Sequence, residues 1–148
     1  MAYVSNEIRR LVEQRALQIC EYCLAYQGYS YIKFQIEHII SLKHGGLSIP
    51  ENLALSCLNC NVNKGSDIGT VVEYDNFTRF YNPRKDHWLQ HFEISENGLI
   101  LSRTYIGEAT AKILNFNSIE QVIERREFIE TGNYPHINAI QLLSNPPS

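Results

Sequence analysis

The chain has 148 residues, a formal net charge of −3 and an apolar fraction of 44%. This length suits one domain or a small domain with an extension, and the ordinary composition excludes disordered and fibrous proteins. The slight acidic excess excludes a protein that coats nucleic acid by bulk charge, and no apolar run approaches the roughly 20 residues of a membrane helix. Because the first ten residues also lack the apolar block of a secretory signal, we expect a cytoplasmic protein with no membrane partner.

The amino-terminal part of the sequence predicts one helix followed by a strand. Apolar residues recur at helical spacing from Ser5 to Ile19, and the Ser5 hydroxyl can cap the first turn. The segment YSYIKFQI at 29–36 then alternates between apolar and polar residues, which is typical of a half-buried strand. The helix should therefore deliver the first cysteine pair at its end.

The next stretch predicts a reversal, a second strand and a short helix. Gly45 and Gly46 can adopt the positive φ angles of a tight turn, and the alternating NLAL at 52–55 can return beside the first strand. Residues 58–64 suit a short helix that Gly65 ends as a left-handed cap. The predicted order is strand, turn, strand, helix.

The second half of the chain predicts an extension packed on this first unit. The aromatic-rich stretch at 70–92 is expected to be mostly irregular, with one helical turn from His87 to Phe92. The segment 92–104 is predicted to form a hairpin, because Asn97-Gly98 suits a type I′ turn. Two helices should follow, at 107–114 and 118–130, and the tail LSNPPS should fray.

All four cysteines lie in the first 60 residues, in two C-x-x-C pairs, Cys20 with Cys23 and Cys57 with Cys60. In a reducing cytoplasm such pairs more often bind a metal than form disulfides, and four thiolates suit a tetrahedral Zn²⁺. Four sulfur ligands leave no position for water, so this zinc would be structural and would clamp the two ends of the predicted hairpin. The alternative is four buried free thiols.

A second pattern lies between the cysteine pairs. Glu37-His38, Gly45-Gly46, Asn52-Leu53 and Cys57-x-x-Cys60-Asn61-x-x-Lys64-Gly65 together resemble the motif of the HNH endonucleases in its cysteine-flanked form. The resemblance implies an α+β fold, with a ββα-metal (His-Me finger) core that holds structural zinc, an amino-terminal helix and a carboxy-terminal extension of a hairpin and helices. The nuclease core would span residues 1–70 and the extension residues 71–148.

The resemblance also implies roles for two residues in catalysis. His38 would be the general base that takes a proton from water, and an unperturbed imidazole, with a pKa of about 6.5, can do so near neutral pH. Asn52 would hydrogen-bond across the hairpin and fix the loop that carries the base. The alternative for Asn52 is an ordinary turn cap, since PEN is a common turn sequence.

Two further residues would bind a catalytic Mg²⁺ or Mn²⁺, for which oxygen ligands are suited. These are Glu37 and Asn61, although Glu37 could instead be a solvated charge on the strand. Strict strand alternation would also point Glu37 and His38 to opposite faces. Lys64 shares a helical face with Asn61, so it either contacts a nucleic-acid phosphate or stays exposed.

The resemblance extends beyond the motif. NPRKDHWLQHF at 82–92 and TYIGEATAKILNFN at 104–117 are similar to the carboxy-terminal extension of a bacterial subgroup of small HNH proteins. Two positions depart from the expected pattern: Ser41 stands where the family often has proline, and Glu108 stands where a basic residue is expected.

The function that the resemblance implies is metal-dependent hydrolysis of phosphodiester bonds in DNA. Two alternatives stay open: a zinc-stabilised module that binds nucleic acid without cutting it, and a protein-interaction domain whose zinc is architectural. The intact set of Glu37, His38, Asn52 and Asn61 favours the enzyme, because a module that only binds has no need of a base beside an oxygen ligand.

Overall fold

The computed structural model describes residues 4–145. It begins with helix α1 (Asn6–Arg15), and the Ser5 hydroxyl accepts a hydrogen bond of 3.2 Å from the Ile8 backbone N–H, as predicted. The helix is shorter than the predicted span of 5–19. Leu17 and Gln18 have positive φ angles of 54° and 63°, and this left-handed turn separates the helix from the first cysteine pair.

A short antiparallel hairpin forms the centre of the amino-terminal half. It consists of β1 (Gln35–His38) and β2 (Leu53–Ser56). The strand predicted at 29–36 is wrong in its position, because β2 offers only four residues to pair with. A 3₁₀ turn, η1 (Gln27–Tyr29), also occupies the start of the predicted range.

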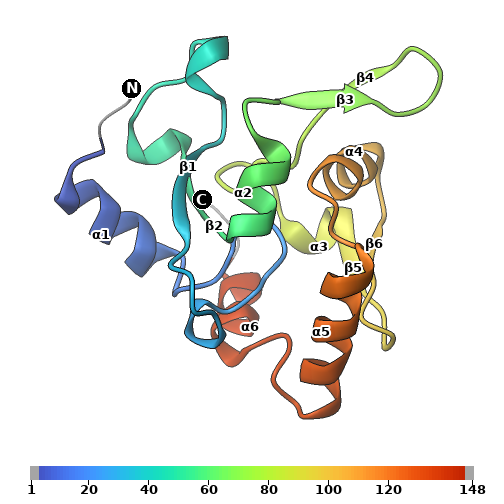
Figure 1. Cartoon of the computed structure of the whole chain (residues 1–148). Helices are drawn as coiled ribbons and strands as arrows, with labels where there is room; N and C mark the ends of the chain where they lie inside the picture. The colour runs from blue at the N-terminus through green and yellow to red at the C-terminus, as the bar shows by residue number, and fades with distance from the viewer. Residues whose placement is uncertain (1–3, 146–148) are drawn as a thin grey trace.

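Helix α2 (Leu58–Lys64) follows β2 and completes a ββα unit, as predicted. Gly65 ends the helix with a positive φ of 52°, but its ψ of −131° differs from the left-handed cap that we expected. α1 contacts β2 and α2 contacts β1, and Figure 1 shows the two helices on opposite sides of the hairpin. The hairpin is therefore covered on both sides by helices of the amino-terminal half.

The loop between β1 and β2 contains two 3₁₀ turns, η2 (Leu42–His44) and η3 (Pro50–Asn52). Gly45 has a φ of 86°, the left-handed conformation predicted for the reversal. Gly46 is needed for another reason, since a Cβ atom there would lie 1.7 Å from the Ile40 carbonyl oxygen. The loop therefore closes tightly on itself.

The extension contains two further hairpins, of which the sequence predicted only the second. The first, β3 (Gly69–Val71) with β4 (Phe77–Arg79), extends from the rest of the chain in Figure 1. The prediction of irregular structure is wrong here, because the turn uses Tyr74 at a φ of 57° and no glycine. The second hairpin, β5 (Phe92–Ile94) with β6 (Ile100–Ser102), confirms the prediction.

The turn of the second hairpin differs from the predicted type I′. A type I′ turn requires positive φ at both central residues. Here Gly98 has a φ of 87°, but the φ of Asn97 is not positive. The Gly98 N–H donates to the Ser95 carbonyl at 3.1 Å, and the Ser95 N–H donates to the Leu99 carbonyl at 2.9 Å. This is a three-residue loop in which glycine takes the left-handed position.

Four helices complete the extension, and three of them were predicted: α3 (Trp88–His91), α4 (Tyr105–Ile113) and α5 (Ile119–Glu130). The fourth, α6 (Ile137–Ser144), was not. It includes Leu143 and Ser144 of the tail that we expected to fray, and residues 146–148 of that tail lie outside the described residues.

One hydrophobic core joins the two halves of the chain. Its buried residues come from both halves, for example Val12 in α1, Leu55 in β2, Phe92 in β5 and Ala139 in α6. The fold is therefore a mixed α+β structure in which the extension packs on the ββα unit. No helix within residues 4–145 is long and apolar enough to cross a membrane.

Candidate active site and metal centre

The four cysteines form one buried cluster, which confirms the prediction from their spacing. Their sulfur atoms all lie within 4.8 Å of one another, and all four are free thiols. The sulfurs of Cys23 and Cys57 are 3.7 Å apart. Sulfurs that share one zinc at about 2.3 Å lie about 3.8 Å from each other in tetrahedral geometry, so the cluster fits a structural Zn²⁺.

Local structure supplies these ligands from two places. Cys20 and Cys23 lie in a turn after α1, hereafter the first zinc turn (residues 20–23), while Cys57 caps α2 and accepts a hydrogen bond of 3.4 Å from the Cys60 N–H. The pKa of the Cys23 thiol is held well below its ordinary value by a hydrogen bond from Cys20 and by those from the other two thiols. The neighbouring thiols instead raise the pKa values of Cys57 and Cys60, so Cys23 is the thiol that this cluster favours as a thiolate.

The two residues between Cys20 and Cys23 both reach into the hairpin. The Glu21 N–H donates to the Leu55 carbonyl at 2.9 Å, and its carboxylate accepts from the Leu55 N–H at 2.8 Å. The Tyr22 side chain is fully buried, and its hydroxyl donates to Glu37 Oε2 at 2.7 Å. The first zinc turn is therefore bonded to both strands.

Glu37 points into the protein, where it forms a buried ion pair. Its Oε1 lies 2.5 Å from Lys64 Nζ, and the side chains of the two residues are only 3% and 1% exposed. Burial raises the pKa of the Glu37 carboxyl to about 7, against the opposing effect of the Lys64 ammonium. Glu37 is thus not the solvated strand charge that was its alternative.

Lys64 differs from the expectation as well. We predicted either a phosphate contact or an exposed lysine, but the ammonium is buried between the Glu37 carboxylate and the His38 carbonyl, to which it donates at 3.0 Å. A side chain with 1% exposure does not offer its charge to a ligand outside. The geometry makes Lys64 the internal counter-charge of Glu37.

The His38 ring is partly buried and contacts the loop between the strands. Its Nε2 is 2.9 Å from Ser48 Oγ, which belongs to the loop between the strands. Burial lowers the pKa of His38, and the nearby Lys64 ammonium lowers it further. Both effects keep the imidazole neutral at physiological pH. The Lys64 ammonium, which pairs with Glu37, therefore also lies close to His38.

Asn52 bridges the loop through its side-chain amide. Its Oδ1 accepts from the Ile40 N–H, and its Nδ2 donates to the carbonyls of Ile40 and Leu47, each at 2.9 Å. These contacts are the cross-hairpin hydrogen bonds that the resemblance implied. They fix both ends of the segment that carries Ser48.

Asn61 lies on α2, three residues before Lys64, and is partly buried. Its side chain makes no hydrogen bond within residues 4–145. Of the remaining histidines, His44 is exposed, and His91 Nδ1 lies 2.6 Å from Thr104 Oγ1. Within the same residues, the cysteine cluster is the one group of three or more His, Cys, Asp or Glu side chains at metal-binding distance.

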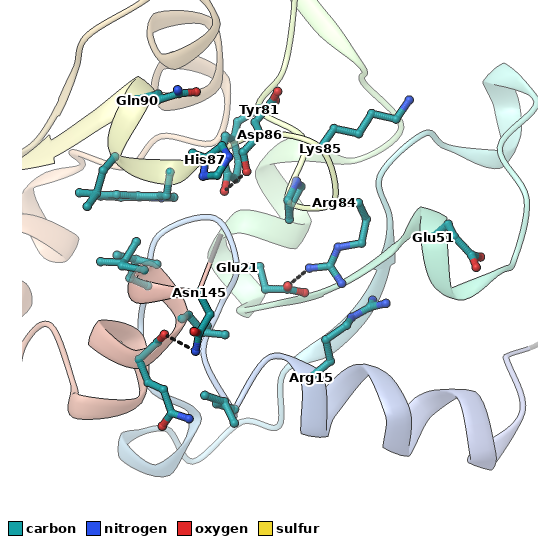
Figure 2. A pocket seen from close by; sticks show the side chains of 18 residues that line it. Arg15, Glu21, Glu51, Tyr81, Arg84, Lys85, Asp86, His87, Gln90 and Asn145 are labelled. Atoms are coloured by element: carbon teal, nitrogen blue, oxygen red, sulfur yellow. Dashed lines mark hydrogen bonds and ion pairs between the residues drawn. The ribbon is translucent and has the colours of Figure 1, made fainter. Parts of the chain in front are cut away.

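A wide cavity of about 970 Å³ lies elsewhere, and neither His38 nor Glu37 lines it. Figure 2 shows Arg15, Glu21 and Arg84 on its wall, with an ion pair between Arg84 and Glu21. The Arg15 guanidinium donates to the carbonyls of Pro50 and Leu53 at 3.0 Å and 2.8 Å. Arg15 therefore joins α1 to η3 and β2, and Arg84 joins the extension to the first zinc turn.

The family model of the HNH endonucleases matches residues 20–67, which begin at Cys20 and end just after α2. Residues 20–67 therefore match an HNH endonuclease domain and are hereafter the HNH domain. The match covers both cysteine pairs and the ββα unit, and with the cysteine cluster it supports the zinc-containing form of this fold. Neither the curated proteins nor the solved structures gave a match.

Two residues of the HNH domain that contact the predicted site were missed in the sequence. Tyr22 lies between two zinc ligands, and no local pattern connects it with Glu37. Ser48 lies in a loop whose path depends on Asn52. A polar aromatic residue inside a buried C-x-x-C turn was the one available signal for Tyr22, because a buried tyrosine hydroxyl needs a hydrogen-bond partner.

Proposed function

We propose that the HNH domain is a metal-dependent endonuclease that hydrolyses phosphodiester bonds in DNA, with His38 as the general base. The observation that carries this proposal is the anchoring of the His38 ring by Ser48 at 2.9 Å. In the tautomer that donates from Nε2 to Ser48 Oγ, Nδ1 carries the free lone pair. That nitrogen can then take the proton of the attacking water.

Asn52 supports this role by positioning. Its three hydrogen bonds hold the loop at Ile40 and Leu47, next to Ser48. A base must be held at hydrogen-bonding distance from the water that it deprotonates, and a loop that moves would lose this geometry. We therefore assign Asn52 to the orientation of His38 rather than to a proton transfer.

Glu37 and Asn61 are the residues that would hold a divalent cation. The Lys64 ammonium already occupies the position at Glu37 Oε1, so a cation would bind there only after this buried ion pair opens. The Asn61 side chain makes no hydrogen bond within residues 4–145. Two oxygen donors completed by water and a substrate phosphate suit Mg²⁺ or Mn²⁺. When bound, such a cation would supply charge neutralisation at the phosphate and at the departing 3′ oxygen.

One observation favours the alternative of a module that binds nucleic acid without cutting it. The Glu37 carboxylate is already paired with Lys64, so the protein has compensated this charge without a metal. In that case the ion pair would be structural, and His38 would be only a polar residue at the end of β1. The compartment remains the predicted cytoplasm, and DNA remains the predicted partner.

The proposal is tested by incubating zinc-loaded protein with supercoiled plasmid and Mg²⁺ or Mn²⁺. We expect nicked or linear DNA, and we expect cleavage to be lost with EDTA and with His38→Ala. His44→Ala is the matched control, because His44 is an exposed histidine of the loop that follows β1. Zinc content and thermal unfolding should be unchanged in both variants.

The outcomes separate the three functions. If His38→Ala cuts as fast as the parent, His38 is not the base. If no protein cuts but all shift labelled DNA in a gel, the module that only binds is correct. If the parent neither cuts nor shifts DNA under any of these conditions, the zinc is architectural in a domain for other partners.

A further inference from the structure

A second cavity, hereafter the aromatic cavity, lies beside the zinc cluster. Its volume is about 470 Å³, within the range of roughly 300–1,000 Å³ that is typical of small-molecule sites. The zinc ligands Cys23 and Cys57 line it, together with residues between 25 and 34 of the HNH domain and between 121 and 136 of the extension. It shares no lining residue with the wide cavity of Figure 2.

Aromatic rings form much of the wall of this cavity. Tyr26 of the HNH domain stacks on His136 of the extension, with 3.7 Å between the ring centroids and 7° between the planes. Tyr29 stacks on Phe128 in the same way, at 4.8 Å and 18°. Tyr31 also lines the cavity, but its side chain is fully exposed and packs on no other ring within residues 4–145. The rim therefore carries one aromatic ring whose faces are free.

The polar groups of the aromatic cavity suit a neutral ligand better than a phosphate. Asn59 and Gln121 line it, and their side-chain amides make no hydrogen bond within residues 4–145. An amide offers both a donor and an acceptor, as the edge of a nucleobase requires. Glu124 at the same cavity would repel a phosphate, and the guanidinium of Arg125 is buried and already donates to two backbone carbonyls.

The zinc side of the cavity is held in place by the extension. The Tyr134 hydroxyl donates to the Cys23 carbonyl at 2.9 Å, and Trp88 Nε1 donates to the Tyr22 carbonyl at 2.8 Å. The stacked pairs described above also join the HNH domain to the extension. The cavity is therefore formed before a ligand arrives, which lowers the entropic cost of binding.

We propose that the aromatic cavity binds one unpaired nucleobase of a DNA substrate, with Tyr31 stacked on the face of the base. A base within a duplex is covered on both faces by its neighbours, so only an unpaired or extruded base can enter such a cavity. This inference rests on the proposed function for the choice of DNA, and it narrows the substrate to DNA that contains an unpaired base.

The position of the cavity relative to the proposed base fits this role. Phe34 lines the cavity and directly precedes β1, and His38 is the last residue of that strand. Four residues at about 3.3 Å each separate Phe34 from His38 by about 13 Å along the strand. This equals about four base steps of B-DNA at 3.4 Å each, so one DNA molecule can occupy both places.

The test measures the binding of two duplexes to the full-length, zinc-loaded protein by fluorescence anisotropy, without added Mg²⁺ or Mn²⁺. One duplex carries a single bulged adenine, and the other carries an abasic residue at the same position. The parent should bind the first about 5-fold or more tightly than the second, as is typical of one stacked base. Tyr31→Ala should raise the Kd for the bulged adenine by a similar factor and leave the Kd for the abasic duplex unchanged.

Tyr74→Ala is the matched control. Tyr74 is also a strongly exposed tyrosine, but it lies in the turn of the first hairpin of the extension and does not line the cavity. We expect its Kd for both duplexes to equal that of the parent. Tyr31→Phe keeps the ring and should also bind as the parent does, because stacking requires the ring and not the hydroxyl. Zinc content and thermal unfolding should be the same in all three variants, since both tyrosines are exposed.

The outcomes separate this inference from the proposed function. Equal affinity of the parent for the two duplexes would overturn the inference, as would a Tyr31→Ala variant that binds the bulged adenine as tightly as the parent. An equal loss on both duplexes would mean that Tyr31 contacts the DNA backbone, and the inference would again be wrong. If the parent prefers the bulged adenine but never cuts DNA after Mg²⁺ or Mn²⁺ is added, only the nuclease proposal fails. If the parent binds neither duplex, both fail.

Discussion

Replacing Lys64 by methionine tests the buried ion pair most directly. Methionine fills a similar volume with an unbranched chain, so the change removes the charge with little disturbance of packing. In the parent, the Glu37 pKa of about 7 lies above its ordinary value of 4.5. Glu37 therefore favours the folded state most strongly below about pH 4.5, and this contribution declines as the pH rises to about 7 and then stays constant.

The variant should behave differently above pH 7. Lys64 is the largest influence that lowers the Glu37 pKa, so its loss raises the folded pKa further. In the variant, the stabilising contribution of Glu37 to the folded state therefore keeps declining above pH 7, by about 1.4 kcal/mol for each pH unit. At pH 6 we expect a cost of about 1 kcal/mol, from the lost hydrogen bond to the His38 carbonyl. At pH 8.5 the cost should be about 2 kcal/mol larger.

The assay is urea unfolding of the zinc-loaded protein without added Mg²⁺ or Mn²⁺, followed by the fluorescence of Trp88, the one tryptophan of the chain. The pH dependence of zinc binding is common to parent and variant, so it cancels in their difference. A double variant, Glu37→Gln with Lys64→Met, should show no extra pH dependence. If Lys64→Met costs the same free energy at pH 6 and pH 8.5, Lys64 is not the counter-charge of Glu37.

Three other predictions concern the loop, the zinc and the base. Asn52→Ala removes three hydrogen bonds, so we expect a loss of about 1–3 kcal/mol in thermal unfolding and slower cleavage. An unchanged melting temperature would contradict this. Cys60→Ser should lower zinc content and unfold the first zinc turn, seen as lost zinc and changed circular dichroism; a fully folded, zinc-free variant would show that the cluster is not structural. At saturating Mg²⁺, kcat/KM should rise with pH to a plateau with a midpoint below 6.5, because burial and Lys64 lower the His38 pKa and the base must be neutral. A midpoint above pH 7 would point to another group.

Local patterns predicted those parts of the fold that depend on a few neighbouring residues. The spacing of the two cysteine pairs was enough to predict the sulfur cluster. Gly45 was enough to predict the reversal in the loop. Asn97-Gly98 marked the second hairpin of the extension, although not its turn type. In each case the chemistry of the residue itself limits the backbone.

Other features depend on partners that are distant in the sequence, and these were missed. The position of β1 is set by the four residues of β2, so alternation at 29–36 was misleading. The first hairpin of the extension turns at Tyr74, which is not a typical turn residue. Lys64 looked like a phosphate ligand because nothing in its helix indicates the carboxylate 27 positions earlier, with which it pairs at 2.5 Å.

The contacts of residues 20–23 with Trp88, Arg84 and Tyr134 also bear on how this protein could be shortened. A fragment that stops at residue 70 would keep every predicted ligand and the base. It would nevertheless leave the carbonyls of Tyr22 and Cys23 without donors and the Glu21 carboxylate without its guanidinium. The smallest working unit is therefore larger than the segment that carries the motif, and grafting that segment alone into another protein would require replacements for these three side chains.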